Sequence, residues 1–201
     1  MPQDRVALSM RNHVEFVICF AACQILGAIC VPFNALWSPA EMLHSLNDCN
    51  PRVIFCDHER ISRLSASGAA FDSKVLVVVG VRMLSTHVPG VIRFEDLPQE
   101  PPRDFVPFQC SPTDFALILY TSGSTGHPKG AVSTHRMVLT ALLSWEVEKI
   151  AVQREIGALY LKPFVQPLTI LCAPPLFHVT RFKKRKRKKK KREREMVFEK
   201  I

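Results

Sequence analysis

The sequence predicts an α/β fold in which a mostly parallel sheet is flanked by helices. Two observations lead to this prediction. Short apolar runs alternate with longer stretches of helical periodicity over the first 80 residues. A further apolar run at 114–119 leads directly into a loop rich in glycine and hydroxyl side chains. Strands that alternate with helices form βαβ units, which place neighbouring strands parallel. The 201 residues are enough to bury a core of one or two domains.

The first predicted unit is a strand, a helix and a second strand, over residues 6–10, 13–27 and 28–33. Within it, residues 16–33 are almost wholly apolar and nearly long enough to cross a membrane. Gln24 interrupts this stretch, and no Lys or Arg follows it as an interfacial anchor. We therefore expect a buried helix that runs into a strand, and no transmembrane segment.

A capping box marks the start of the next helix. In Ser38-Pro-Ala-Glu41 the serine caps the helix, Pro39 takes the first helical position, and Glu41 reaches back to the backbone. The helix is predicted to end near Asp48, because Asn50 precedes a proline and such residues disfavour helical geometry.

The alternation continues with a strand at 52–57, a short helix near 59–67 and a strand at 74–80. The last of these holds four valines and is the clearest strand in the sequence. Residues 95–113 are rich in charge and proline, with five prolines from Pro98 to Pro112, and predict a connecting loop.

The segments beyond residue 130 predict one more strand and one more helix. Residues 131–133 predict a return strand, and Thr134 is expected to cap a helix from His135 to about residue 149. The pattern over 150–167 is ambiguous between helix and strand.

The most informative segment is the eleven-residue run Tyr120-Thr-Ser-Gly-Ser-Thr-Gly-His-Pro-Lys-Gly130. It combines three glycines, four Ser or Thr hydroxyls and Lys129, directly after the predicted strand at 114–119. Glycine lets successive backbone N–H groups turn toward one ligand, and such groups form an anion site. The hydroxyls add hydrogen-bond donors, and the lysine adds a compact positive charge. This chemistry predicts a site for a polyphosphate.

The run is not a Walker A loop, which reads Gly-x-x-x-x-Gly-Lys followed by Ser or Thr. Five positions after Gly123 stands Pro128, and Lys129 is followed by another glycine. A flexible linker is the alternative reading. Linkers do not combine a strand on each side with a fixed lysine, so the phosphate site is the favoured interpretation.

These residues resemble the phosphate-binding signature of the adenylate-forming enzymes, which include acyl-CoA synthetases, firefly luciferase and the adenylation domains of peptide synthetases. The signature reads Ser/Thr-Ser-Gly-Ser/Thr-Thr-Gly-x-Pro-Lys-Gly, and residues 121–130 fit every fixed position. The resemblance implies that eight residues bind the phosphates of ATP: Thr121, Ser122, Gly123, Ser124, Thr125, Gly126, Lys129 and Gly130.

A second segment, Ala173-Pro-Pro-Leu-Phe-His-Val179, is similar to the family's Pro-Leu-Phe-His segment, which borders the carboxylate-substrate pocket. A single His after an aromatic residue is more often a packed or capping residue. Beside the first motif, His178 becomes a candidate substrate-binding residue. Three further segments look like the opening of the family's large domain: residues 4–8, 27–34 and 52–57. The resemblance covers roughly residues 3–180.

The charge of the chain is concentrated at its C-terminus. The chain holds 27 Lys and Arg and 18 Asp and Glu, a formal net charge of +9. Residues 181–201 hold 13 of the basic and 3 of the acidic residues, which leaves 14 basic and 15 acidic residues in the body. The body therefore gives no electrostatic sign of nucleic-acid binding. We expect an incomplete AMP-binding domain over 1–180, and a polybasic tail, disordered or aberrant, over 181–201.

Eleven of the twelve residues from Arg181 to Arg192 are basic. Such a block can contact nucleic acid or anionic membranes nonspecifically, or act as a nuclear address. It can arise from translation past a missed splice site, from a frame change, or as an evolved basic tail. A noncatalytic module that binds through this tail is therefore the alternative function.

Seven cysteines are scattered through apolar segments without a C-x-x-C pair, which is typical of reduced, buried thiols in a cytosolic protein. Cys19 and Cys23 lie one helical turn apart, but no His or Cys pair at ligand spacing accompanies them, so no metal site is predicted. No secretory signal is evident. The expected location is cytoplasmic, or nuclear through the basic tail.

The resemblance implies a ligase that joins a carboxylic acid to ATP, releases pyrophosphate, and then passes the acyl group from AMP to coenzyme A. ATP, Mg²⁺ and coenzyme A are the implied cofactors, and a fatty or aryl acid is the implied substrate. The family's later segments, which help to hold Mg²⁺, the ribose and the adenylate, do not occur in this sequence. We therefore expect the chain to be inactive alone, and we assign no catalytic residue.

Overall fold

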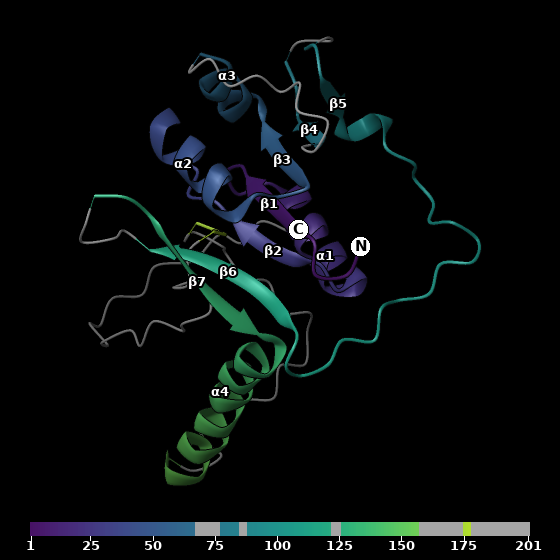
Figure 1. Ribbon diagram of the computed structural model, residues 1–201. Helices are drawn as coiled ribbons and strands as arrows, with labels where there is room; N and C mark the ends of the chain where they lie inside the picture. Colours follow the sequence, from purple (N-terminus) through teal and green to yellow (C-terminus); the bar gives the residue numbers. More distant parts are fainter. Residues whose placement is uncertain (67–76, 85–87, 122–125, 157–174, 178–201) are drawn as a thin grey trace, which may run out of the picture.

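The computed structural model describes residues 1–66, 77–84, 88–121, 126–156 and 175–177 (Figure 1). Several of the predictions fall on other residues and lie outside the described part of the chain. They concern the centre of the glycine loop, the start of the valine-rich strand, the ambiguous segment beyond residue 156, His178 and the tail at 181–201.

Seven strands form a single sheet in the order β5-β4-β3-β1-β2-β6-β7. Neighbouring strands run parallel throughout, except that β6 and β7 form an antiparallel hairpin. The strands are β1 (Arg5–Ser9), β2 (Ile29–Pro32), β3 (Val53–Asp57), β4 (Val77–Val81), β5 (Val91–Arg93), β6 (Phe115–Thr121) and β7 (Lys129–Thr134). The predicted fold class, a mostly parallel sheet with helices, is confirmed.

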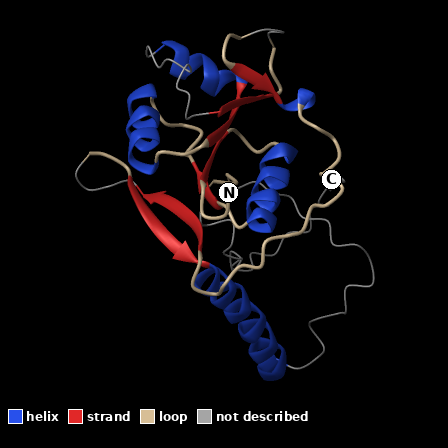
Figure 2. Ribbon diagram, turned by 45° about the vertical axis from the view of Figure 1, so that its right-hand side comes forward, coloured by secondary structure: helices blue, strands red, loops and turns tan. Residues whose placement is uncertain are grey.

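Helices cover both faces of the parallel part of the sheet (Figure 2). They are α1 (Val14–Leu26) on one face and α2 (Pro39–Cys49) and α3 (His58–Ala66) on the other, whereas α4 (His135–Ile156) packs against the β6–β7 hairpin. Helix α1 buries Phe16 and Cys23 against one face, whereas α2 and α3 bury Met42 and Leu64 against the other. The result is a three-layer arrangement with a hydrophobic core on each side of the sheet.

Strand β2 shows how the sequence supplies both cores. All four of its residues are buried. Ile29 and Val31 pack in the core below α2 and α3, and Cys30 packs in the core below α1. Successive side chains of a strand point to opposite faces, so a central parallel strand covered on both sides is apolar at every position. This explains why its sequence lacks the polar alternation of a half-exposed strand.

Only one face of α1 is buried, which differs from the buried helix that its apolar sequence predicts. Its outer side chains Val17, Ile18 and Ile25 are each about half exposed. The helical part of the apolar stretch ends at Leu26, and Gly27, with a φ of 66°, then turns the chain toward β2. In the described part of the chain, no helix has both the length and the apolar character needed to cross a bilayer.

The predicted capping box of α2 is confirmed. The Ser38 hydroxyl accepts the Glu41 N–H at 3.4 Å, and the Glu41 carboxylate accepts the Ser38 N–H at 2.8 Å. The helix ends at Cys49, one residue after the predicted end at Asp48, and Asn50 follows it in the left-handed conformation. Both ends of α2 are therefore set by local sequence.

We predict that Ser38→Ala lowers the free energy of unfolding by about 1 kcal/mol, because the Glu41 N–H loses the Ser38 hydroxyl as its acceptor. Urea denaturation of the full chain measures this change. Ser38→Thr keeps the capping oxygen and serves as the control. An alanine variant as stable as the threonine variant would contradict the assignment.

The structure contains elements that the sequence did not predict. Strand β5 and the 3₁₀ turn Phe94–Asp96 precede the proline-rich loop, and α4 extends to Ile156 rather than ending near residue 149. A three-residue edge strand is too short to show a periodic pattern. No glycine or proline interrupts residues 135–156, and Gly157 follows, so the helix continues to that point.

Candidate functional site

The glycine loop joins the two strands of the β6–β7 hairpin, at one edge of the sheet. The register pairs Tyr120 with Gly130 and Thr121 with Lys129. Thr121 is therefore the last residue of β6, and Lys129 is the first residue of β7. Four of the eight predicted phosphate-binding residues lie outside the described residues: Ser122, Gly123, Ser124 and Thr125.

Thr121 and Lys129 are paired at the end of the hairpin where the glycine loop joins the two strands. Both residues are exposed, and the Thr121 hydroxyl donates to the Lys129 carbonyl oxygen at 3.5 Å. Directly opposed residues of an antiparallel pair project from the same face. By the alternation along β6, this is also the face of Leu119 and not that of Tyr120. The hydroxyl and the ammonium group are thus available together on one side of the hairpin.

The two described glycines of the motif have different physical roles. Gly126 has a φ of 88°, is exposed, and has open space where a Cβ would stand. Glycine is favoured at this position because other residues rarely adopt this backbone conformation. At Gly130, a Cβ would stand 2.9 Å from the Ile118 side chain and 3.4 Å from the Tyr120 ring. Gly130 therefore makes room for the packing of β6 beneath it.

Helix α2 contacts the hairpin on both sides of the glycine loop. Before the loop, the Tyr120 hydroxyl donates to the Asp48 carboxylate at 2.5 Å. After the loop, the His127 ring stacks on His44 with centroids 4.7 Å apart. The sequence analysis did not identify these contacts. The only local signal was the choice of Tyr and His next to the glycines, because the partners lie more than 70 residues earlier in the chain.

The second motif lies against the strand that leads into the glycine loop. The Leu176 N–H donates to the Asn12 side-chain oxygen at 2.8 Å, just beyond the end of β1. Leu176 is buried in the core below α1. Phe177 packs at the margin of the same core, as does Leu119 of β6. His178 follows directly and lies outside the described residues, so the structure brings its neighbours, though not His178 itself, to the hairpin.

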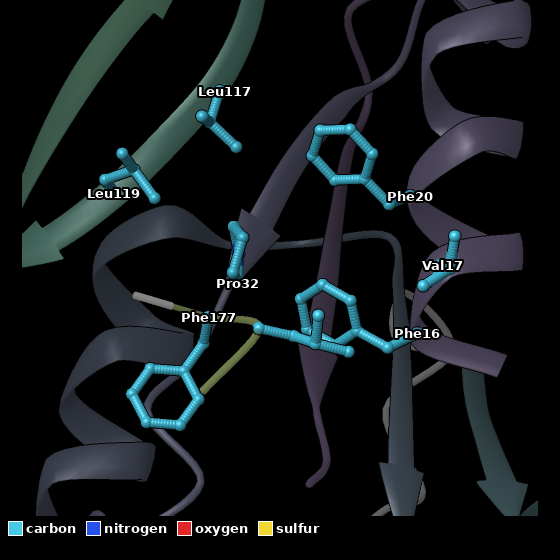
Figure 3. A pocket seen from close by; sticks show the side chains of 8 residues that line it. Phe16, Val17, Phe20, Pro32, Leu117, Leu119 and Phe177 are labelled. Atoms are coloured by element: carbon cyan, nitrogen blue, oxygen red, sulfur yellow. The ribbon is translucent and has the colours of Figure 1, made fainter. Parts of the chain in front are cut away.

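An apolar pocket of about 200 Å³ opens where the second motif meets the sheet (Figure 3). Side chains from α1, β2, β6 and the second motif line it: Phe16, Val17, Phe20, Pro32, Leu117, Leu119, Leu176 and Phe177. The face of β6 that carries Leu119 thus presents apolar surface near its middle and the polar Thr121 at its end. An anionic group and an apolar group of one ligand would find suitable surroundings along this face.

The described cysteines do not form a chemical centre. Six are free thiols, five of them buried, and Cys172 lies outside the described residues. Burial raises the pKa of Cys19 to about 12 and that of Cys49 to about 11, so both remain protonated at neutral pH. Within the described ranges, no three His, Cys, Asp or Glu side chains gather as metal ligands.

Comparison with known proteins places these features in a family. A family model described as AMP-binding enzyme matches residues 1–183. A 4-coumarate–CoA ligase from Nicotiana tabacum is 27% identical over 178 residues, which cover 89% of this chain and 30% of the relative. A long-chain-fatty-acid–CoA ligase from Mycobacterium tuberculosis is 33% identical over 144 residues, which cover 71% and 27%. The chain thus spans about 30% of the length of these relatives.

Solved structures agree with the sequence comparison. An anthranilate CoA ligase in complex with anthranoyl-AMP superposes with a TM-score of 0.60 at 28% identity, over 71% of this chain and 26% of the other. The N-terminal domain of a fatty acyl-CoA ligase from Mycobacterium tuberculosis gives a TM-score of 0.55 at 30% identity, over 72% and 34%. The sheet order, the hairpin and the matched segment lead to one conclusion: this chain belongs to the AMP-binding enzyme family, and its relatives are acyl- and aryl-CoA ligases.

Proposed function

We propose that this chain forms the phosphate-binding part of a ligase that activates a carboxylic acid with ATP and transfers the acyl group to coenzyme A. The residues from Thr121 to Gly126 bind the β- and γ-phosphates through backbone N–H groups and hydroxyls. Lys129 balances the phosphate charge, and Gly130 lets β7 pack close to β6. His178, which follows the docked Phe177, contacts the carboxylate substrate.

The physical demand of this reaction is control of charge. The carboxylate and the triphosphate are both anionic, so donors and cations must neutralise the phosphates before the acid can attack phosphorus. The hairpin meets this demand because it presents an exposed hydroxyl and an exposed ammonium group beside a loop that passes through Gly126 at positive φ. This juxtaposition of Thr121 and Lys129 is the observation that carries the proposal.

Magnesium belongs to the proposal as a partner of the triphosphate. Mg²⁺ keeps several waters and binds substrate phosphates with few protein ligands, so the phosphate oxygens supply much of its coordination. Coenzyme A supplies the thiol that displaces AMP. Neither group is assigned to residues of the described part of the chain.

The substrate class is proposed to be a fatty or aryl acid. The relatives are named for 4-coumarate and for long-chain fatty acids. The apolar pocket lined by Leu119 and Phe177 lies beside the second motif and suits the apolar part of such an acid. Thermal-shift measurements of the full chain with MgATP and a panel of fatty and aryl acids test this class, and stabilisation that favours short polar acids would contradict it.

We predict that Lys129→Ala weakens the affinity for MgATP about tenfold or more, because the phosphate charge loses its ammonium partner. Isothermal titration of the full chain with MgATP measures the dissociation constant. Lys129→Arg keeps the charge and should retain part of the affinity.

Arg103→Ala is the matched control, since Arg103 is an exposed cation in the proline-rich loop, away from the hairpin. Its dissociation constant should equal that of the wild type. If Lys129→Ala also binds MgATP like the wild type, or if the wild type shows no MgATP binding, the proposed phosphate site is wrong.

A further inference from the structure

Tyr120 directly precedes the glycine loop and joins the hairpin to helix α2. Its hydroxyl donates to Asp48 at 2.5 Å and lies 3.3 Å from the Ser45 carbonyl oxygen, both on helix α2. Its ring meets Phe33 and Trp37 edge-on, with centroids 5.9 and 5.5 Å away. The side chain is therefore held at its ring and at its hydroxyl.

Asp48 has an electrostatic reason to hold this hydroxyl. It lies in the last turn of α2, where unpaired carbonyl groups make a negative side chain unfavourable. A donor to the carboxylate offsets that repulsion. Burial and the bond to Asp48 raise the pKa of the Tyr120 hydroxyl, so the group keeps its proton and remains a donor. The pair is thus a charge-assisted hydrogen bond that joins α2 to β6.

The contact lies at a point from which it can affect the loop. Thr121 follows Tyr120 directly. Gly130 is the cross-strand partner of Tyr120, and its lack of a side chain leaves space for the Tyr120 ring. Beyond the loop, the stacking of His127 on His44 ties the returning chain to the same helix. Both ends of the loop are therefore fixed to α2 and not only to each other.

We propose that Tyr120 is a positioning residue for Thr121 and Lys129. Asp48 holds the Tyr120 hydroxyl, so that these two residues are already placed to bind the phosphates. This inference rests on the proposed function. The Tyr120 side chain itself lies on the opposite face of β6 from Thr121 and does not touch the nucleotide. It acts by holding the end of β6 against α2, so that less ordering of Thr121 and Lys129 is required when the nucleotide binds.

The experiment measures MgATP affinity and amide hydrogen exchange in the full chain. Tyr120→Phe removes only the hydroxyl and leaves the ring contacts in place. It should weaken MgATP binding about fivefold, since a hydrogen bond to a charged group is lost and part of its effect reaches the loop. Asp48→Ala should match it, and Asp48→Asn, which keeps an acceptor oxygen, should stay near the wild type. Asp96→Ala, an exposed carboxylate beside the far edge strand, is the control.

The double variant Tyr120→Phe with Asp48→Ala should bind no more weakly than either single variant, because both remove the same bond. The amides of Thr121, Lys129 and Gly130 should exchange faster in each variant without nucleotide present. A role in stability alone would lower the melting temperature and speed exchange throughout the sheet rather than at these amides, while the MgATP affinity stays unchanged, and that result overturns the inference.

The two proposals fail in different ways. If Lys129→Ala weakens MgATP binding while Tyr120→Phe and Asp48→Ala do not, the phosphate site stands and the positioning inference is wrong. If the wild type binds no MgATP, the proposed function is wrong and the positioning inference falls with it.

Discussion

Arg60→Met is expected to lower the free energy of unfolding by about 3–5 kcal/mol, because it leaves a buried carboxylate without its partner. Arg60 is 1% exposed and Asp57 is 4% exposed. The guanidinium group donates to both carboxylate oxygens of Asp57, at 3.1 and 3.0 Å. Methionine fills a similar volume and supplies no donor, so the cost reflects the lost charge pairing rather than a cavity.

The same guanidinium group joins two loops at the carboxyl ends of the strands. It donates twice to the Ala35 carbonyl oxygen, at 2.9 and 2.5 Å, in the segment between β2 and α2. The Asp57 carboxylate also accepts hydrogen bonds from the backbone N–H groups of Arg11 and Arg60, at 3.0 and 3.1 Å. Removal of Arg60 therefore also leaves a buried carbonyl group unsatisfied, which adds to the cost.

Arg63→Met is the matched control. Arg63 lies one turn along α3, pairs with Glu59 at 2.6 Å, and is one-third exposed. Arg63 also donates to the Trp37 carbonyl oxygen at 3.1 Å. Because a partly exposed ion pair is worth only about 0–1 kcal/mol and one further hydrogen bond about 1 kcal/mol, this variant should lose much less stability in urea denaturation than Arg60→Met. Arg60→Lys keeps the charge without the planar fork and should fall between them. Equal stability of the Arg60→Met and Arg63→Met variants would refute the assigned role of the buried pair.

Gly27→Ala is expected to lower the free energy of unfolding by about 2–3 kcal/mol, since it combines backbone strain with a steric clash. Gly27 has a φ of 66° at the end of α1. A Cβ at this position would stand 2.2 Å from Cδ1 of the Phe108 ring. The ring cannot simply swing aside with its loop, because the Phe108 N–H donates to the Ile25 carbonyl oxygen at 3.0 Å.

A second background separates the two causes. In a Phe108→Ala chain the clash is absent, and the further change Gly27→Ala should cost only about 1–2 kcal/mol, the price of the left-handed conformation. Thermal and urea denaturation of the four variants give this comparison. An unchanged cost of Gly27→Ala in the two backgrounds would show that Phe108 does not restrict this turn.

Local sequence was sufficient for most of the elements. The apolar runs at 28–33 and 52–57 predicted strands, because a covered parallel strand needs apolar side chains on both faces. The capping box at Ser38 and the left-handed residue Asn50 set the ends of α2 through contacts only a few residues apart. The glycine and hydroxyl run led to the proposed phosphate site in the same way, because the chemistry of such a site is contained in consecutive residues, and that site stays a prediction.

Contacts between distant residues could not be predicted in this way. The sequence contains no sign that Tyr120 meets Asp48, or that Leu176 meets Asn12, because each pair is separated by at least 72 residues. The buried Arg60 was likewise overlooked, since its charge alone is typical of a solvated helix face. These contacts depend on which strands become neighbours in the sheet.

The sequence by itself determined most of the strands, both ends of α2 and the residue types of the glycine loop, all of which follow from backbone conformation and side-chain type over short distances. The tertiary structure alone decided the sheet order, which places β6 next to β2, and the contact between Tyr120 and the end of α2. The physical reason is that the free energy gained by burying apolar surface is non-directional and does not depend on which apolar face is the partner. Only the packing of all elements together selects one arrangement, and with it the partners that hold Tyr120, Leu176 and Arg60 in place.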